Sequence, residues 1–346
     1  MKKTYRLFCT VCLAGTLAFL ASSCKKNDEQ AAFKIVLPEF EEAIGEPDDA
    51  DRAYIDFTTN TLRWQANDQV MIYNIDNEGQ TTKKALYATD ANALGLAQAH
   101  FDFVEGAALG EKQDHLFFFY PVSKLQNGTA ALDADNREYF TVSRVQNYTL
   151  DKDGNPTIDP NAMALACETQ EMTDVFSLKH IFGVCRLRLF GVNNMVVDSI
   201  QLVDNGMSLT GSVSMKLHEV NMTTFSDLMT AYKLVENGQP ELSESFVNAW
   251  NEYRATLGYM PQGNGNTVTL NCHTDQVDGI ALSQTAQTVF YISVRPGAFI
   301  KGFTINVFTN GNTTPYVIDR YSAPKDSYRI RAGVITGFNY PYVIGQ

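Results

Sequence analysis

The sequence predicts an all-β protein built from two tandem β-sandwich domains, and three observations support this fold class. The chain has 346 residues, a length that suggests about two domains. Aromatic residues make up 11%, with 21 Phe and 16 Tyr, and aromatic side chains favour strands. Short segments of alternating apolar and polar residues are separated by turn signals, which is typical of β-sandwiches.

The composition excludes several other classes of protein. Hydrophobic residues make up 45% and charged residues 19%, so the chain has enough apolar residues to form folded cores. The formal net charge is −12 and the pI is about 4.9. Because nucleic-acid binding needs a basic surface, we expect no nucleic-acid partner.

Residues 1–23 have the features of a signal peptide. Met1–Arg6 is cationic, and the apolar run Leu7–Leu20 is shorter than the ~20 residues that a transmembrane helix needs. Small residues then precede Cys24, an arrangement that resembles the cleavage site of bacterial lipoproteins. We expect cleavage before Cys24 and lipid attachment to its thiol. The alternative is an ordinary secretory signal peptide followed by an incidental cysteine.

Residues 24–32 are expected to form a flexible tether. The polar run Lys25–Gln30 places lysines before acidic residues and resembles the surface-export signal of Bacteroidota lipoproteins. The resemblance implies a cell outer membrane location with the chain facing outward. The lipid would be the only contact with the membrane.

Residues 33–170 are predicted to form the N-terminal β-sandwich. Phe33–Pro38 alternates in polarity and is expected to be its first strand, whereas the acidic segment Glu39–Asp51 is expected to be a loop. The aromatic run 116–122 is bounded by turn signals and predicts a strand buried on both faces. Other strands are expected at 53–57, 70–73 and 99–103.

Residues 171–346 are predicted to form the C-terminal β-sandwich. Asn310-Gly311 is a hairpin turn signal. A helical insertion is expected at 226–257, where apolar residues from Leu242 to Leu257 recur at helical spacing. This apolar stripe either covers a sheet edge or binds a ligand or partner. Strands are expected at 184–190, 197–203, 208–214, 289–294, 303–308, 316–321 and 334–338.

The sequence contains no recognisable catalytic motif. The five histidines show no H-x-x-x-H pairing, and there is no nucleophile elbow or phosphate-binding loop. We therefore expect no enzymatic activity, no cofactor and no metal site, although Asp151–Asn155 allows either a solvated turn or a cation site. After the signal peptide and Cys24, only Cys167, Cys185 and Cys272 remain. We expect them to be buried free thiols, the alternative being one disulfide.

Several segments together resemble the fimbrillin-like proteins, the subunits of the type V pili of Bacteroidota. Trp64–Tyr73 resembles their W-x-x-G-D-x-I-x-V-Y segment, with Asn67 in place of the glycine. Asparagine also tolerates a left-handed turn. Phe119-Tyr120-Pro121 resembles a strand end of the family, and Phe182–Leu189 resembles the opening of its second domain. With Ala332-Gly333-Val334, the likeness extends over nearly the whole mature chain.

The resemblance implies two transthyretin-like β-sandwich domains and assembly by strand exchange. In the family, a surface protease removes the N-terminal strand, often after an arginine, and a neighbour's strand replaces it. Arg52-Ala53 is the matching position, although Arg52 is equally compatible with an ordinary surface residue. Phe33, Ile35 and Leu37 alternate, so we expect them to point to one face and fill a groove in the first domain.

The expected function is therefore a lipid-anchored pilus subunit, or an accessory, tip or anchor component in cell adhesion. Its partners would be other pilus subunits or itself, and host or bacterial surface ligands. The tail residues Tyr340, Tyr342 and Ile344 alternate and could donate a short strand, which favours an accessory, anchor or tip role. The alternative is a non-polymerising surface lipoprotein that binds a glycan or host ligand through Trp64, Trp250 or Tyr253.

Replacing Cys24 by Ala should release the protein from membranes, because the thioether to the lipid needs this thiol. Membrane fractionation and labelling with a fatty acid would measure the effect. Continued labelling of the Cys24→Ala chain would contradict lipid attachment at this residue.

Overall fold

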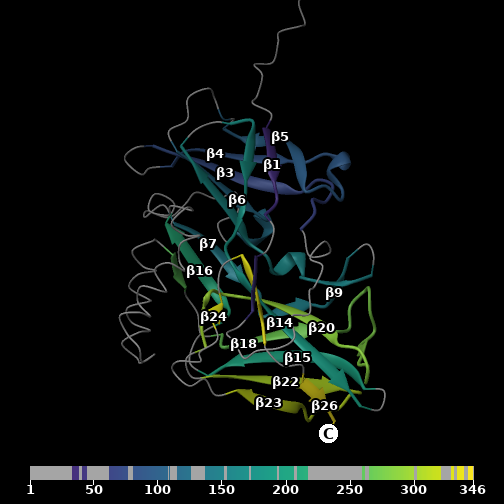
Figure 1. The fold of residues 1–346 in the computed structure, drawn as a ribbon. Helices are drawn as coiled ribbons and strands as arrows, with labels where there is room; N and C mark the ends of the chain where they lie inside the picture. The colour runs from purple at the N-terminus through teal and green to yellow at the C-terminus, as the bar shows by residue number, and fades with distance from the viewer. Residues whose placement is uncertain are drawn as a thin grey trace, which may run out of the picture.

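The structure is a computed structural model, and it describes most of the chain (Figure 1). The predicted signal peptide, the predicted tether, Cys24, Arg52, Ala53 and the predicted insertion 226–257 lie outside the described residues. The described ranges are 33–38, 41–44, 62–76, 81–107, 109, 115–125, 137–151, 154–170, 173–192, 195–205, 209–216, 259–261, 265–299, 302–320, 329–330, 333–338 and 342–345.

The first lobe is one eight-stranded sheet with the strand order β12-β1-β5-β4-β3-β6-β11-β13. The outer strands β12 and β13 are separated in the chain only by Leu178, so the two ends of the sheet meet and the sheet curls around its own core. Its strands are β1 (Phe33–Val36), β3 (Gln69–Ile75), β4 (Thr81–Ala88), β5 (Gln98–Gly106), β6 (His115–Tyr120), β11 (Leu165–Thr169), β12 (Val175–Ser177) and β13 (Lys179–His180).

The core of the first lobe is rich in aromatic rings, as the composition predicts. Phe117, Phe118 and Phe119 of β6 are all buried, which confirms the prediction of a strand buried on both faces. Trp64 is fully buried and packs edge-on against Tyr120, with ring centroids 5.0 Å apart. Asn67 has a φ of 62°, so the left-handed turn expected at this position is confirmed.

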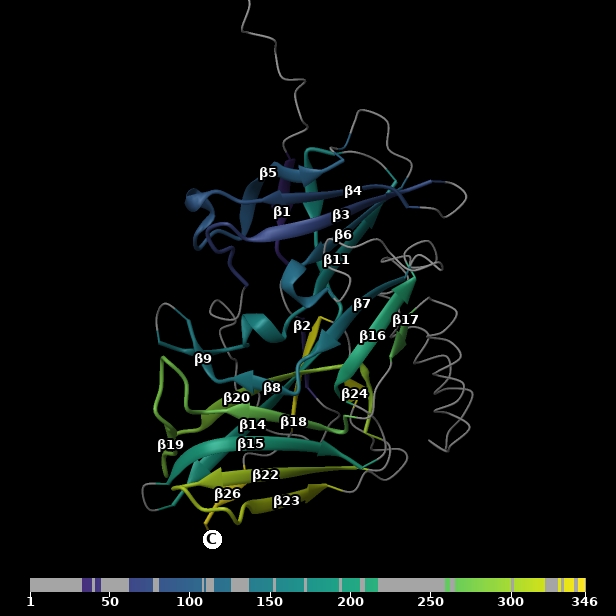
Figure 2. The ribbon, with the colours of Figure 1, turned by 180° about the vertical axis from the view of Figure 1, so that it is seen from behind.

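The second lobe packs two sheets around another core (Figures 1 and 2). One sheet has the order β2-β25-β14-β20, with β26 also paired to β14. The other has the order β23-β22-β15-β18-β8, with β19 paired to β15. Their strands are β2 (Glu41–Ile44), β8 (Val145–Asn147), β14 (Gly183–Gly191), β15 (Val196–Asp204), β18 (Thr267–Asn271), β19 (Ile280–Ala281), β20 (Thr288–Val294), β22 (Phe303–Thr309), β23 (Tyr316–Arg320), β25 (Val334–Gly337) and β26 (Tyr342–Ile344).

Smaller sheets and short turns of 3-10 helix complete the described fold. A three-stranded sheet has the order β17-β16-β7, and the pairs β9–β10 and β21–β24 stand apart from it. These elements are β7 (Arg137–Val142), β9 (Thr149–Leu150), β10 (Pro156–Thr157), β16 (Gly211–Lys216), β17 (Tyr259–Pro261), β21 (Gly297–Ala298), β24 (Arg329–Ile330), η2 (Ala91–Ala93), η3 (Val122–Lys124) and η4 (Pro160–Ala162).

Strand pairing crosses the predicted domain boundary at residue 170 in both directions. Strands β7 and β8 precede this residue but pair with β16 and β18. Strands β12 and β13 follow it but belong to the first sheet. These pairings define sheets and do not by themselves define domains, so the division into 33–170 and 171–346 stays a prediction.

Several segments differ from the sequence expectations: β7, β11 and β18, for example, lie where no strand was predicted. The acidic segment 39–51, expected to be a loop, contains β2, which pairs in parallel with β25. Strand β4 was not predicted, because Lys83 and Lys84 interrupt its apolar pattern. Strand β16 begins at Gly211 rather than at residue 208.

A side-chain amide joins the two sheets of the second lobe. Gln146 of β8 is buried, and its Oε1 accepts from the Ser293 amide at 2.8 Å. Its Nε2 donates to the Ser293 carbonyl at 2.6 Å. The side chain thus satisfies both backbone groups of one β20 residue, as a neighbouring strand would.

Replacing Gln146 by Leu should lower the free energy of unfolding by about 1–3 kcal/mol, because it leaves two buried backbone groups without partners. Urea denaturation would measure the loss. Gln276→Leu is a matched control, since the exposed Gln276 side chain accepts from the Leu150 amide and water can replace it. Equal losses in both variants would contradict this account.

Candidate functional site

Strand β1 is an interior strand of the first sheet, although it comes from the N-terminal end of the described chain. It pairs in parallel with β12 and antiparallel with β5. The Lys34 amide donates to the Asp174 carbonyl at 2.9 Å, and the Leu37 amide donates to the Ala97 carbonyl at 2.9 Å. Backbone groups on both sides of β1 are therefore used in the sheet.

The structure brings the three predicted plug residues together in one core. Phe33, Ile35 and Leu37 are 1%, 0% and 5% exposed and belong to the same buried cluster. Lys34 between them is exposed. Burial of such side chains contributes roughly 1.5–3 kcal/mol each. These apolar contacts would therefore hold the segment in the sheet even without its covalent link to the rest of the chain.

Aromatic rings surround Phe33 on several sides. Its ring centroid lies 4.8 Å from that of Tyr87, 5.4 Å from Phe176 and 5.9 Å from Phe118. Phe118 and Phe176 meet it edge-on, a geometry that aromatic pairs prefer. The space between β5 and β12 that β1 fills is called here the β1 slot. At the position of Phe33, the β1 slot fits an aromatic side chain.

Trp64 fixes the middle of β1 through a hydrogen bond. Its indole Nε1 donates to the Ile35 carbonyl at 3.1 Å. Because the ring is fully buried, Trp64 is not available to stack on a sugar, and this part of the glycan-binding alternative is wrong. Trp250 and Tyr253 lie outside the described residues.

The N-terminal segment continues from β1 into the second lobe. Strand β2 lies along β25, with Glu41 opposite Val334 and Ile44 opposite Gly337. Figure 2 shows β2 between the two lobes. Residues 33–44 therefore supply one strand to a sheet in each lobe. Sequence reasoning missed the second contact because the segment is acidic and lacks an alternating apolar pattern.

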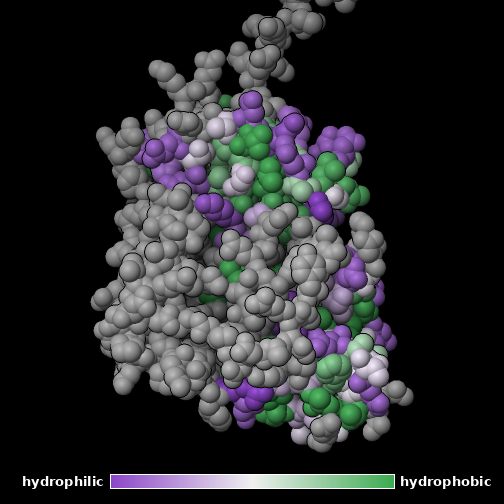
Figure 3. Space-filling view, viewed as in Figure 1, coloured by the Kyte–Doolittle hydropathy of each residue, from purple (hydrophilic) through white to green (hydrophobic). Residues whose placement is uncertain are grey.

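Apolar side chains also reach the surface near the β1 slot. In Figure 3, hydrophobic residues gather on the first lobe where Figure 1 draws β1 and β5. Val175 of β12 is 44% exposed and Val104 of β5 is 48% exposed. Both neighbours of β1 thus carry an exposed apolar side chain.

The C-terminal tail is paired within its own chain. Strand β26 lies parallel to β14, and Tyr342 and Ile344 are buried in the core of the second lobe. Arg320 donates to the Tyr342 hydroxyl at 3.1 Å, and its guanidinium lies 4.7 Å from the centre of that ring. Tyr340 lies outside the described residues.

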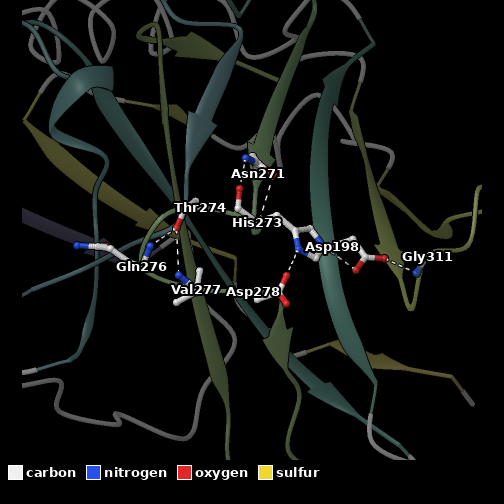
Figure 4. A network of polar contacts seen from close by, with 8 residues as sticks. All are labelled: Asp198, Asn271, His273, Thr274, Gln276, Val277, Asp278 and Gly311. Atoms are coloured by element: carbon white, nitrogen blue, oxygen red, sulfur yellow. Dashed lines mark hydrogen bonds and ion pairs between the residues drawn. The ribbon is translucent and has the colours of Figure 1, made fainter.

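An exposed polar network joins three segments of the second lobe (Figure 4). The two ring nitrogens of His273 contact Asp278 Oδ1 at 2.8 Å and Asp198 Oδ1 at 3.0 Å. Asp198 Oδ2 accepts from the Gly311 amide at 2.6 Å. Hydrogen bonds to Asp278 first and then Asp198 raise the pKa of His273 above its ordinary value.

This network is suited to joining segments rather than to holding a metal. The two carboxylates lie on opposite sides of the imidazole (Figure 4), so they do not converge on one ion. Within the ranges given above, no group of three His, Cys, Asp or Glu side chains could hold a metal. In the turn 151–155, for which the sequence allows either a solvated turn or a cation site, Asp151 Oδ1 accepts from the Asn155 amide at 2.9 Å.

The three remaining cysteines are free, as expected. Cys185 and Cys272 are buried and Cys167 is partly buried. Burial raises the pKa of Cys272 to about 12 and that of Cys167 to about 11. These thiols therefore stay protonated and unreactive at neutral pH.

Comparison with known proteins gives structural neighbours only. No protein-family description matches the sequence, and no curated protein matches it. Within the described part of the chain, no helix is long and apolar enough to cross a membrane.

The neighbours are solved structures from Bacteroidota. A "putative cell adhesion protein" from Bacteroides ovatus is 14% identical over 88% of this chain and 91% of its own, with a TM-score of 0.42. Another from Bacteroides uniformis is 13% identical over 80% and 88%, with a TM-score of 0.45. The tip fimbrial protein Mfa3 from Porphyromonas gingivalis is 10% identical over 87% and 92%, with a TM-score of 0.34. By name, these three neighbours are adhesion or fimbrial proteins.

The His273 network should stabilise the fold most at low pH. Because its pKa is raised in the folded state, protonated His273 contributes stability that is fully present below about pH 6.5, the unfolded value, and is lost as pH rises through the folded pKa. The gap in melting temperature between wild type and His273→Ala should therefore narrow as the solution becomes alkaline.

An NMR titration of the imidazole provides the control. The midpoint should lie above about 6.5 in wild type and fall in Asp278→Asn, which removes the first cause of the shift. A midpoint that is the same in both chains would contradict the network.

Proposed function

We propose that this chain is a lipid-anchored surface subunit that joins other pilus subunits, or copies of itself, by exchange of its N-terminal strands. The observation that carries the proposal is the position of residues 33–44, which complete one sheet in each lobe. Arg52 follows in the sequence, eight residues after Ile44. A cut after Arg52 would sever the covalent link between both strands and the rest of the chain.

After such a cut, only noncovalent interactions would hold the segment. Loss of β1 would leave unpaired backbone groups on β5 and β12 and expose the apolar surface that covers Phe33, Ile35 and Leu37. An incoming strand satisfies both at once, because its backbone restores the ladder and its side chains restore the core. A fitting donor would carry an aromatic residue and two aliphatic residues at alternate positions.

The tail of this chain is a weaker candidate donor than a strand from another subunit. Strand β26 is docked on β14, with Tyr342 and Ile344 in the core. Donating it would remove both side chains from that core. This pairing supports a role as an accessory or tip component, which accepts a strand more readily than it supplies one.

Cell-surface attachment in the proposal rests on Cys24 and on the tether that follows it. Lipid on Cys24 would hold the N-terminal segment at the outer membrane, and cleavage after Arg52 would free the folded lobes from that segment. Anchoring and assembly are therefore alternatives for one molecule, since the cut that opens the β1 slot also removes the lipid.

Treatment of the soluble chain with an Arg-specific protease should convert monomers into a ladder of assemblies, because the cut opens the β1 slot to a competing strand. Size-exclusion chromatography and electron microscopy would follow the change. Arg52→Ala should abolish the ladder, whereas Arg63→Ala, which removes an exposed arginine nearby, should preserve it. Unchanged monomers from wild type would overturn strand exchange between copies of this chain.

A further inference from the structure

The hairpin between β22 and β23 turns at Asn310-Gly311. An asparagine that is followed by glycine is prone to deamidation, in which the glycine nitrogen attacks the asparagine side chain. Glycine favours this reaction because it has no Cβ to hinder the approach of the two groups. The sequence alone therefore marks this turn as a site of spontaneous modification.

The turn itself does not shield these two residues. Asn310 and Gly311 have φ values of 53° and 71°, as a type I′ turn requires at both central positions. The Asn312 amide donates to the Thr309 carbonyl at 3.0 Å and closes the turn. Asn310 is exposed, and a Cβ added to Gly311 would meet no atom of the described chain within 4 Å. Protection from the reaction therefore has to come from hydrogen bonds rather than from burial.

Both reacting groups are instead bound to β15. The Gly311 amide, which would be the nucleophile, donates to Asp198 Oδ2 at 2.6 Å (Figure 4). The Asn310 side-chain carbonyl, which would be attacked, accepts from the Val196 amide at 2.9 Å. His273 Nε2 lies 3.0 Å from Asp198 Oδ1 and so holds the carboxylate in place. Nucleophile and electrophile are thus held by two different residues of one strand.

Deamidation would require both contacts to break. The Gly311 nitrogen must lose its proton and form a bond to Asn310 Cγ. The bond from Cγ to the side-chain nitrogen then breaks, and ammonia leaves with, in the net balance, the proton that the Gly311 nitrogen gave up. Water then opens the succinimide to aspartate or isoaspartate. The Asp198 carboxylate opposes the first step, because the anionic nitrogen would face a like charge in place of a charge-assisted hydrogen bond.

We propose that Asn310 is a self-modification site of this chain and that Asp198 is the positioning residue that keeps it unreactive. Isoaspartate would place an extra backbone carbon in the turn, and either product would bring a second carboxylate near that of Asp198. Modification would therefore loosen the hairpin that holds the edge strand β23 on β22. This role is independent of strand exchange, and it gives the polar network of Figure 4 a task besides joining segments.

Peptide mapping by mass spectrometry after incubation in mildly alkaline buffer would measure the deamidation rate of Asn310. In the native chain this rate should be at least about tenfold below that of the same chain unfolded in urea, because a charge-assisted hydrogen bond and a neutral one must open first. Asp198→Ala should raise the native rate about tenfold and leave the rate in urea unchanged. Equal rates for native and unfolded wild type would overturn the proposal.

Two control variants separate this role from general effects. Asp278→Ala removes the other carboxylate on His273 but keeps the acceptor of the Gly311 amide, so it should keep the slow rate. Gln146→Leu weakens the second lobe away from the turn and should keep the slow rate too. Acceleration of equal size in Gln146→Leu would overturn the proposal, because global unfolding would then govern the reaction. A rate in Asp198→Ala at or below that of wild type would overturn it as well, and a lower rate would mean that the carboxylate acts as a base.

If Asp198→Ala does not fold, His273→Ala replaces it, because the carboxylate then loses the contact that orients it. The native rate should rise in this variant too, and an unchanged rate would overturn the role of Asp198. The measurement does not depend on assembly, so failure of ladder formation would leave its result intact.

Discussion

The structure depends on the rule that buried backbone groups must be hydrogen-bonded. Strand β1 lies inside the first sheet and satisfies β5 and β12 on its two sides, yet it is followed by a long stretch before the sheet resumes at β3. This interior strand of the lobe is thus also one of those most easily separated from it by a cut in the chain. Trp64 adds a third contact to β1 besides its pairing with β5 and β12, because the indole Nε1 donates to the Ile35 carbonyl.

The same rule explains how the two lobes are tied together. The chain passes between them several times, and each passage is fixed by pairing in the second lobe, as with β2 on β25 and β8 on β18. Buried side chains add specific links: the Tyr73 hydroxyl of β3 donates to the Glu138 carboxylate of β7. Because Glu138 is fully buried, this bond offsets the cost of removing a charge from water.

The sequence predicted those parts of the fold in which side-chain pattern and pairing agree. Strands β1 and β6 carry clear apolar patterns, and both were found where they were expected. Strand β2 was missed because its pairing is decided by the free edge of β25, a partner nearly three hundred residues away in the chain. The burial of His180 was missed for the same reason, since no local pattern marks a histidine that will be enclosed by distant segments.

The closure of the first sheet has a consequence for the shape of the space that β1 fills. Strands β12 and β13 are joined through Leu178, so the strands other than β1 form one continuous path from β5 through β11 to β12. Departure of β1 would open a single slit, in which β5 stays paired with β4 while β12 stays joined to β13 through Leu178. A receptor already in its binding shape loses little conformational entropy when a new strand enters. In the proposed exchange, the β5 wall would therefore be preorganised for an incoming strand, whereas β12 would regain its only strand partner among the described strands when that strand entered.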